Sequence, residues 1–296
     1  MQSLSAFRTR LGPSLCETWD RLLASKGAGE AQAPLKNFTR IAQPVAHLPL
    51  WVAEAVHKTK REITDEALGA AVEAAILGYL CVQGQDDLID SDGVQANALL
   101  LAHALFCRHQ TALLPLVTGH PGFWRMFEEK WLAYSEALAF KGAAQRRPGY
   151  MDAAAFQQVL RRSQPLVIPG AAVLVHLDRW DLFPALERLV RHSTTAAQLF
   201  DDLVDAQHDL LHGNHTWVVN RLGGGEGPAT LGRRLYVEGG YETVIEEALR
   251  ELAAAREVAT HLGMESARLA LERDAERMSA MRNRIVDTLA RLLFDE

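Results

Sequence analysis

The chain has 296 residues, of which 48% are hydrophobic and 23% are charged, and its formal net charge is −6. This length and apolar content suffice for the core of one large domain or two ordinary ones. The negative charge argues against a nucleic-acid-binding protein, because that class is typically basic.

The cysteines and the apolar runs bear on the cellular compartment. Cys16, Cys81 and Cys107 lie far apart without a C-x-x-C pair, which argues against a disulfide framework and a zinc knuckle. The first 30 residues contain no apolar core of a signal peptide. Apolar runs reach only about 10 residues, whereas a membrane helix needs about 20. We therefore expect no transmembrane segment and a location in the cytoplasm.

Helical periodicity recurs along the whole chain, whereas the alternation of apolar and polar residues that marks strands is nearly absent. Breakers such as "TGHPG", "RRPGY" and "GGGEGPA" separate the periodic stretches. In chain order, the predicted helices are 3–25, 47–60, 66–91, 93–116, 121–142, 151–163, 166–177, 180–212, 229–238, 241–262 and 264–294. No linker is long enough to separate two domains, so we predict one all-α domain over residues 1–296.

The predicted helix 66–91 is unusual because its apolar run ends in acidic residues, in the stretch "CVQGQDDLID". Asp86 and Asp90 are four residues apart and therefore share one face of the helix, with Asp87 beside them. A solvated acidic surface is the alternative interpretation, and for a single copy of such a pattern it is the commoner one.

A second acidic cluster, "DDLVDAQHD", lies near the end of the predicted helix 180–212. Asp201, Asp205 and Asp209 fall at about 0°, 40° and 80° around the helix axis and form one stripe, whereas Asp202 points about 100° from Asp201. Like charges at this spacing repel, and the cost rises when the groups are desolvated. Mg²⁺ offsets this repulsion because it prefers carboxylate oxygens and completes its shell with water and substrate phosphates. Two such clusters therefore predict a Mg²⁺ site.

The two motifs together resemble the paired aspartate-rich motifs of class I isoprenoid synthases, the superfamily of trans-isoprenyl diphosphate synthases and terpene cyclases. "DDLID" at 86–90 resembles the first motif and "DDLVDAQHD" at 201–209 the second, and Gln198 matches a glutamine that chain-elongating members carry before their second motif. The resemblance implies an antiparallel bundle of about ten to twelve helices around a central cavity. It also implies three Mg²⁺ ions, bridged by the diphosphate of an allylic prenyl diphosphate substrate, and homodimers are usual in the family.

By this resemblance, both motifs contribute metal ligands. The expected ligands are Asp86, Asp87, Asp90, Asp201, Asp202, Asp205 and Asp209, although Asp202 could form a salt bridge instead. The ions polarise the leaving diphosphate, so the catalytic role would fall on Asp86, Asp90, Asp201 and Asp205. Residues one and two turns before each motif would line the substrate cavity, namely Tyr79, Val82 and Gln83 before the first and Thr194 and Gln198 before the second.

The sequence lacks the cationic segments with which elongating synthases hold isopentenyl diphosphate. The stretch after the first motif, "SDGVQANALL", contains no cation, and Ser163-Gln164 and Gly213-Asn214 stand where Lys-Thr and Gly-Lys are expected. Without these donors a second anionic substrate would lose charge-assisted contacts. We therefore favour ionisation of a single diphosphate substrate and cyclisation, as in terpene synthases. The alternatives are a chain-elongating prenyltransferase that uses other cations and, from another class, a non-catalytic subunit of a prenyl synthase.

Two further pairs of residues are candidates for binding the diphosphate. Arg161 and Arg162 lie between the motifs and could bind it or form a solvated surface pair. His208 and His212 are four residues apart beside the second motif, where they could bind phosphate, hold a transition metal such as zinc, or lie in solvent. The basic stretch 141–150 could cap the site or be exposed, and we favour the exposed alternative.

Overall fold

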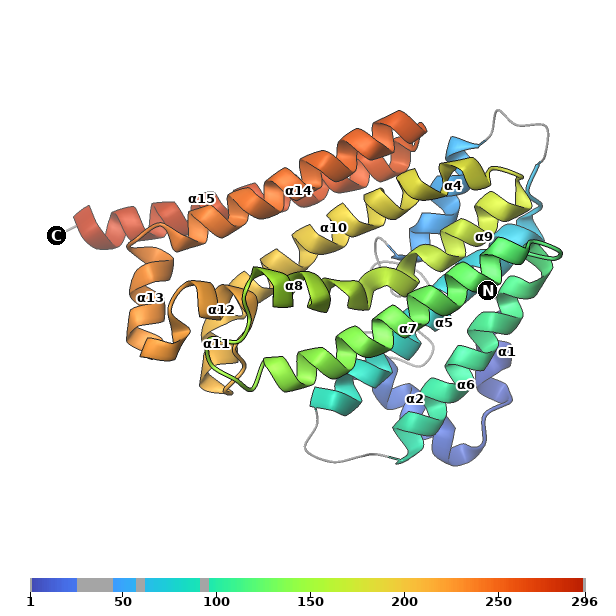
Figure 1. Ribbon diagram of the computed structural model, residues 1–296, viewed down its shortest axis with the longest axis horizontal. Coiled ribbons are helices and arrows are strands. Elements are labelled where there is room, and N and C mark those ends of the chain that lie inside the picture. Colours follow the sequence, from blue (N-terminus) through green and yellow to red (C-terminus); the bar gives the residue numbers. More distant parts are fainter. Residues whose placement is uncertain (1, 26–44, 57–61, 91–95, 295–296) are drawn as a thin grey trace. The chain divides into compact units, whose positions relative to one another are not determined.

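The computed structural model describes residues 2–25, 45–56, 62–90 and 96–294, and in these residues every regular element is a helix (Figure 1). The all-α fold predicted from the sequence is confirmed. The chain divides into two compact units, and we describe each by itself. The first unit comprises Met1–Lys130 and Pro165–Leu186, and the second comprises Trp131–Gln164 and Glu187–Glu296. The single domain expected for residues 1–296 stays a prediction.

The first unit is built around one long apolar helix, α5. Its helices are α1 (Gln2–Thr9), α2 (Pro13–Ser25), α4 (Leu48–Ala55), α5 (Asp65–Asp90), α6 (Ala96–Leu113), the first part of α7 (Pro121–Ala144) and α9 (Ile168–His176). α5 contacts α4, α6 and α9. From residue 71 to residue 81, every α5 side chain except Val72 and Tyr79 is buried, so this stretch forms the core of the unit.

The start of α5 follows from local chemistry. The Oγ1 atom of Thr64 accepts a hydrogen bond from the backbone N–H of Ala67 at 3.2 Å, which satisfies one of the free donors of the first turn. Asp65 and Glu66 add negative charge at the positive end of the helix dipole. The acidic end of α5 has no such local advantage, because negative charge at a helix C-terminus is unfavourable.

A buried histidine marks the contact between α5 and α6. His109 is 1% exposed, and its ring lies against Gly78, where an added Cβ atom would be 3.0 Å from two ring atoms. Its Nδ1 atom is 2.8 Å from the backbone oxygen of Ala74, and because a carbonyl oxygen can only accept, Nδ1 carries the proton. Burial lowers the pKa of His109 to about 4, although the hydrogen bond to Ala74 acts in the opposite direction.

The second unit contains the acidic stripe and a long helical hairpin. Its helices are the rest of α7, α8 (Ala153–Leu160), most of α10 (Phe183–Val204), α11 (Ala206–Leu211), α12 (Trp217–Arg221), α13 (Pro228–Tyr236), α14 (Gly240–Leu262) and α15 (Glu265–Phe294). α14 and α15 lie side by side (Figure 1). Gly263 joins them with a φ of 73°, the left-handed conformation that commonly ends a helix.

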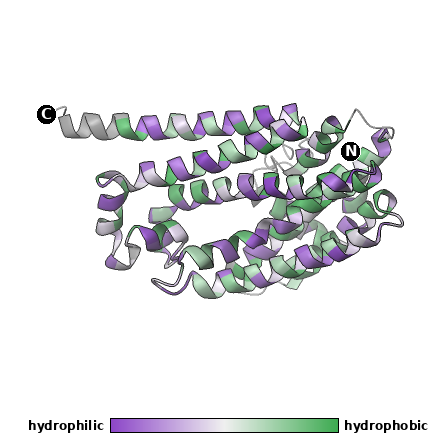
Figure 2. Ribbon diagram, turned by 45° about the horizontal axis from the view of Figure 1, so that its top comes forward, coloured by the Kyte–Doolittle hydropathy of each residue, from purple (hydrophilic) through white to green (hydrophobic). Residues whose placement is uncertain are grey.

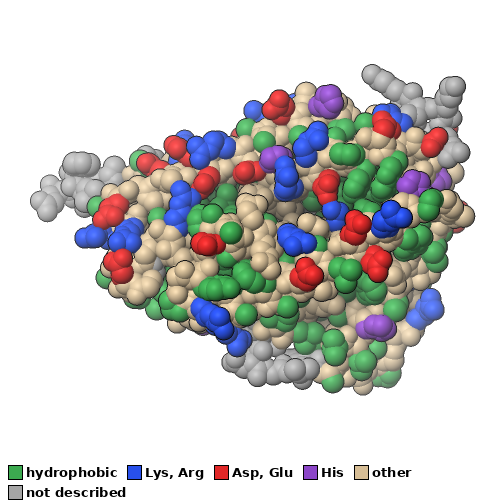
Figure 3. Space-filling model, in the orientation of Figure 1, with side chains coloured by type: hydrophobic (Ala, Val, Ile, Leu, Met, Phe, Trp, Pro, Cys, Tyr) green, Lys and Arg blue, Asp and Glu red, His purple; other side chains and the backbone are tan. Residues whose placement is uncertain are grey.

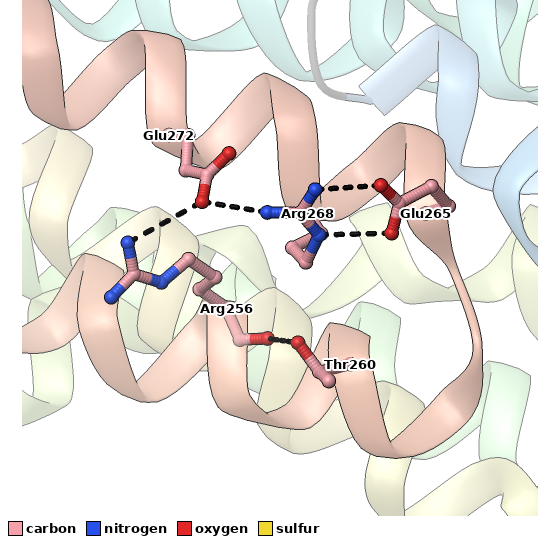
Figure 4. Close-up of polar contacts among 5 residues, drawn as sticks. All are labelled: Arg256, Thr260, Glu265, Arg268 and Glu272. Atoms are coloured by element: carbon pink, nitrogen blue, oxygen red, sulfur yellow. Dashed lines mark hydrogen bonds and ion pairs between the residues drawn. The ribbon is translucent and has the colours of Figure 1, made fainter.

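Charged side chains link α14 to α15 (Figure 4). Arg268 donates hydrogen bonds to both carboxylate oxygens of Glu265 and to Glu272, and Arg256 of α14 lies 3.7 Å from the same carboxylate of Glu272. Exposed ion pairs contribute little stability, so the apolar face of α14 contributes more, through Val244, Ile245, Ala248, Leu252, Ala255 and Ala259. The helix that leads to the C-terminus alternates between hydrophilic and hydrophobic residues, as expected when one face meets solvent (Figure 2).

Two of the predicted helices are wrong because each is interrupted in the structure. The prediction of one helix over 3–25 fails because Pro13 starts a new helix, α2, at the position where its missing N–H costs nothing. The prediction over 180–212 fails at Asp205, which separates α10 from α11, and Trp180–Leu182 is a 3-10 turn (η4). Arg161–Val167, around Pro165, is likewise a 3-10 helix (η3). The end of the predicted helix 47–60 lies outside the described residues.

One helical stretch, Asp65–Ile89 of α5, is long and apolar enough to cross a membrane when judged by length and composition. This differs from what the short apolar runs suggested. However, 56% of its most apolar segment is buried inside the protein, as expected of a core helix. The surface in view in Figure 3 carries interspersed acidic and basic side chains with apolar side chains between them.

His109 provides a test of the packing between α5 and α6. Between about pH 6.5 and pH 4 the unfolded chain binds a proton that the folded chain excludes, so the free energy of unfolding should fall as the pH is lowered through this range. His109→Asn should remove this dependence, by up to about 1.4 kcal/mol per pH unit. Urea unfolding of both proteins at pH 7, 6, 5 and 4 measures the difference. Parallel pH profiles would contradict a buried, neutral histidine.

Candidate functional site

The first acidic cluster lies at the end of α5, in the first unit. Tyr79, Val82, Gln83 and Asp86 are all partly exposed, whereas the intervening Leu80, Cys81 and Gly84 are buried. The spacing of the partly exposed residues places them on one side of the helix, directly before the acidic end. Asp90 is the last residue of α5, and its side chain lies outside the described part of the chain.

Asp87 is exposed and lies at a pocket of the first unit. It lines a pocket of about 260 Å³ between α2, α5 and α6, together with Arg21 and Leu22 of α2 and Leu101 of α6. This pocket therefore brings a cation of α2 into the neighbourhood of the first motif. The assignment of Asp87 as a metal ligand stays a prediction.

The second acidic cluster crosses the break between α10 and α11. Asp205 has φ −92° and ψ 0°, outside ideal helical geometry, so the helix axis is interrupted there. The backbone bonds of the stripe nevertheless persist, since the N–H of Asp205 donates to the oxygen of Asp201 at 2.9 Å and the N–H of Asp209 to that of Asp205 at 2.7 Å. The four-residue spacing therefore survives the break, and the stripe extends over both helices.

The carboxylate of Asp205 disfavours the charge of the other two carboxylates of this stripe. The pKa of Asp201 is raised by desolvation and then by the charge of Asp205, and Arg162 only partly offsets this, although the Asp201 side chain is exposed. The pKa of Asp209, which is half-buried, is also raised by desolvation and then by Asp205. Opposing contributions to Asp209 come from a hydrogen bond with Asn214 and from the charges of His208 and Lys141. A bound cation would therefore stabilise the ionised form of Asp201 and Asp209.

Asp202 turns away from the stripe and into the protein. Its side chain is buried, and its Oδ1 atom accepts a hydrogen bond from Gln198 Nε2 at 2.6 Å. Desolvation raises the pKa of Asp202 to about 7, although Gln198 and Arg162 act in the opposite direction. The Oε1 atom of Gln198 in turn accepts a hydrogen bond from Arg162. Contacts therefore run from Arg162 through Gln198 to Asp202. This arrangement is closer to the alternative in which Asp202 pairs with a cation than to the one in which it binds a metal ion.

The two neighbouring arginines have different surroundings. Arg162 contacts Gln198 and interacts with Asp201 and Asp202, whereas Arg161 is exposed and lies 3.9 Å from Glu136. Only one of the pair therefore faces the second motif. Thr194, one turn before Gln198, hydrogen-bonds through Oγ1 to Ser163 Oγ at 3.0 Å, which ties α10 to η3.

His208 and His212 lie on the exposed side of α11, with ring centroids 4.1 Å apart. Nδ1 of His212 donates to the backbone oxygen of His208 at 2.8 Å, so this nitrogen is already used. Among the described residues, no group of three or more His, Cys, Asp or Glu side chains could hold a metal ion by itself. This gives no support to a closed zinc site at the histidines.

The sequence analysis missed Lys141, which interacts with Asp209. The basic stretch 141–150 was expected to be exposed, and its residues 146–150 are, but Lys141 itself is 6% exposed. The signal was present in the periodicity of α7, because Tyr134, Ala137, Leu138, Lys141 and Ala144 share the buried face of the helix. A lysine at a core position of an amphipathic helix needs a partner.

The donor set fits Mg²⁺ better than a softer metal. The stripe offers carboxylate oxygens, the ligands that Mg²⁺ prefers, and their mutual repulsion is what a divalent cation would relieve. The absence of a three-ligand group among the described residues is compatible with this, because Mg²⁺ commonly takes one or two carboxylates and fills its shell with water and substrate phosphates.

No protein-family model and no curated protein matches the sequence. Among solved structures, a geranylgeranyl pyrophosphate synthetase from the archaeon Geoglobus acetivorans superposes with a TM-score of 0.67, over 92% of this chain and 94% of that chain, at 17% sequence identity. The chain has the class I isoprenoid synthase fold. The fold implied by the resemblance of the two aspartate-rich stretches is thereby confirmed. The stretch 86–90 ends α5, and the stretch 201–209 spans the break between α10 and α11.

Asp202 provides a test of the inward-facing part of the second motif. Between about pH 4 and pH 7 the folded protein retains a proton on Asp202 that the unfolded chain has released, so this residue should lower the stability as the pH rises through that range. Asp202→Asn keeps an oxygen for Gln198 and should flatten the profile. Thermal unfolding in the presence of a chelator, from pH 4 to pH 8, measures it. If Asp202→Asn leaves the pH dependence of the melting temperature unchanged, the Asp202 carboxyl is not buried as described.

Proposed function

We propose that the chain is a Mg²⁺-dependent class I isoprenoid synthase that acts on an allylic prenyl diphosphate, and that its reaction is chain elongation by prenyl transfer. The likeness to a geranylgeranyl pyrophosphate synthetase supports elongation over the cyclisation that the sequence favoured. The observation that carries the proposal is the position of Arg162 beside Gln198 and Asp201, because it supplies a cation near the second motif where the expected lysines are missing.

The proposed reaction forms no covalent bond to the protein. The allylic C–O bond breaks and its electron pair leaves with the diphosphate; the double bond of isopentenyl diphosphate then attacks the carbocation, a C–C bond forms and a proton is lost. In the first unit Asp86 and Asp90 of α5 would bind Mg²⁺, and in the second unit Asp201, Asp205 and Asp209 of the stripe would bind it; bound Mg²⁺ would supply Lewis-acid assistance to the leaving group.

The remaining roles belong to side chains near the two motifs. Arg162 would bind a phosphate oxygen through charge-assisted hydrogen bonds, and Gln198 would orient it. Tyr79 and Val82, on the partly exposed side of α5, would hold the hydrocarbon chain and exclude water, and the ring of Tyr79 would stabilise positive charge. A cytoplasmic location and a homodimer stay predictions.

Cyclisation is the second candidate because one observation favours it. The ten residues that follow the first motif, "SDGVQANALL", contain no cation that could hold the diphosphate of a second substrate. A cyclase would need only the allylic substrate, so the two candidates differ in their requirement for isopentenyl diphosphate.

Turnover separates these candidates. Purified protein should release inorganic diphosphate from dimethylallyl, geranyl or farnesyl diphosphate when Mg²⁺ and isopentenyl diphosphate are present, and mass spectrometry should detect longer prenyl diphosphates. Asp205→Asn should reduce the rate at least about 10-fold, since it removes a metal ligand, whereas Glu246→Gln, an exposed change on α14, should not. Cyclic hydrocarbons without isopentenyl diphosphate would establish the cyclase. No diphosphate release under any condition would favour the non-catalytic subunit.

Arg162 and Arg161 form a matched pair for testing phosphate binding. Arg162→Met should raise the KM for the prenyl diphosphate about 10- to 100-fold, the effect of losing a hydrogen bond to a charged group. Arg162→Lys should recover part of this affinity because it keeps the charge. Arg161→Met is the control, because Arg161 is exposed and lies near Glu136 instead. Equal effects of the two methionine substitutions would show that only the overall charge matters.

A further inference from the structure

Lys141 is a charged residue at a core position of the second unit. It is 6% exposed and lies on the buried face of α7, between Leu138 and Ala144. Burial of an ammonium group is costly unless an acidic or carbonyl partner compensates for the lost water. The proposal for α10 and α11 above uses Arg162 but gives no role to Lys141.

A backbone hydrogen bond joins the end of α7 to the segment that follows the acidic stripe. The backbone oxygen of Gln145, one turn after Lys141, accepts a hydrogen bond from the N–H of His215 at 2.7 Å. The N–H of Asn214 in turn donates to the backbone oxygen of Asp209 at 2.8 Å. Residues four apart share a helix face, so the side of α7 that carries Lys141 meets the segment around Asn214.

Two groups outside the stripe favour the charged form of Asp209. The side chain of Asn214 donates a hydrogen bond to its carboxylate, and the ammonium group of Lys141 attracts it electrostatically. Its other charged neighbours, His208 and Asp205, belong to the stripe and its helix. Lys141 is therefore a cation on another long helix whose charge acts on Asp209, as the charge of Arg162 acts on Asp201 at the opposite end of the stripe.

We propose that Lys141 is a positioning residue for the metal site of the second motif: with Asn214 it holds the carboxylate of Asp209 in the orientation in which the stripe binds a divalent cation. This inference rests on the proposed function, since it requires the stripe to be a metal site. The physical reason is that Asp209 follows the break at Asp205 and is repelled by its neighbour. Without a tether on α7 its carboxylate would turn towards solvent and away from the other two.

The proposal and simple electrostatics predict opposite changes in cation affinity when Lys141 is removed. Removal of a positive charge near a metal site should, through charge alone, tighten the binding of a cation. If Lys141 positions Asp209, its removal should instead weaken binding, because one carboxylate is no longer held in place. Loss of a partner that orients a metal ligand typically lowers metal affinity 10- to 100-fold.

The test is an EPR titration of the metal-free, full-length protein with Mn²⁺, in the presence of inorganic diphosphate. Lys141→Met should weaken Mn²⁺ binding about 10-fold, and Lys141→Arg should restore part of the affinity. Arg146→Met, which removes the same charge from an exposed position five residues on, should leave it unchanged. Unchanged or tighter binding in a folded Lys141→Met protein would overturn the proposal.

A second variant covers the case in which Lys141→Met does not fold. Asn214→Ala removes the other tether of Asp209 without emptying a core position, and it should weaken Mn²⁺ binding in the same direction; wild-type affinity would count against the proposal. Asp205→Asn separates the two levels of inference. If it weakens binding and the Lys141 and Asn214 variants do not, only the positioning role is wrong. If it binds Mn²⁺ like the wild type, the metal site and the positioning role both fall.

Discussion

The repulsion among the carboxylates of Asp201, Asp205 and Asp209 is the constraint on which the second unit depends. Their spacing puts them on one side of a nearly continuous helical path, and the backbone bonds from Asp209 to Asp205 and from Asp205 to Asp201 keep them there. Desolvation and the charge of Asp205 both oppose the ionisation of Asp201 and Asp209. A protein with no use for this arrangement would gain stability by losing one of the acids.

The protein offsets part of this repulsion with cations from other helices. Arg162 of η3 acts at one end of the stripe and Lys141 of α7 at the other, and neither is close to the stripe in sequence. Both residues belong to the segment Trp131–Gln164 of the second unit, so one stretch of chain supplies positive charge at both ends of the stripe. This compensation is only partial, because the pKa values of Asp201 and Asp209 remain raised.

In the first unit, the buried helix α5 ends in a cluster of acidic residues. The middle of α5 is rich in small and apolar residues, so that α6 approaches closely enough for His109 to reach a backbone oxygen of α5. The acidic end lies beyond this core, after a side on which Tyr79, Val82 and Gln83 are only partly buried. The packed part of the helix fixes the direction of the acidic part.

The sequence by itself determined the helical class, most helix boundaries, the family resemblance of the fold and the existence of the acidic stripe. These features depend on the periodicity of a single helix, which local spacing encodes. The tertiary structure decided the break at Asp205, the inward turn of Asp202, the choice of Arg162 over Arg161 and the partnership of Lys141 with Asp209. Each of these depends on which side chains other elements bring near, and a helical pattern specifies a face but not the neighbour that will meet it.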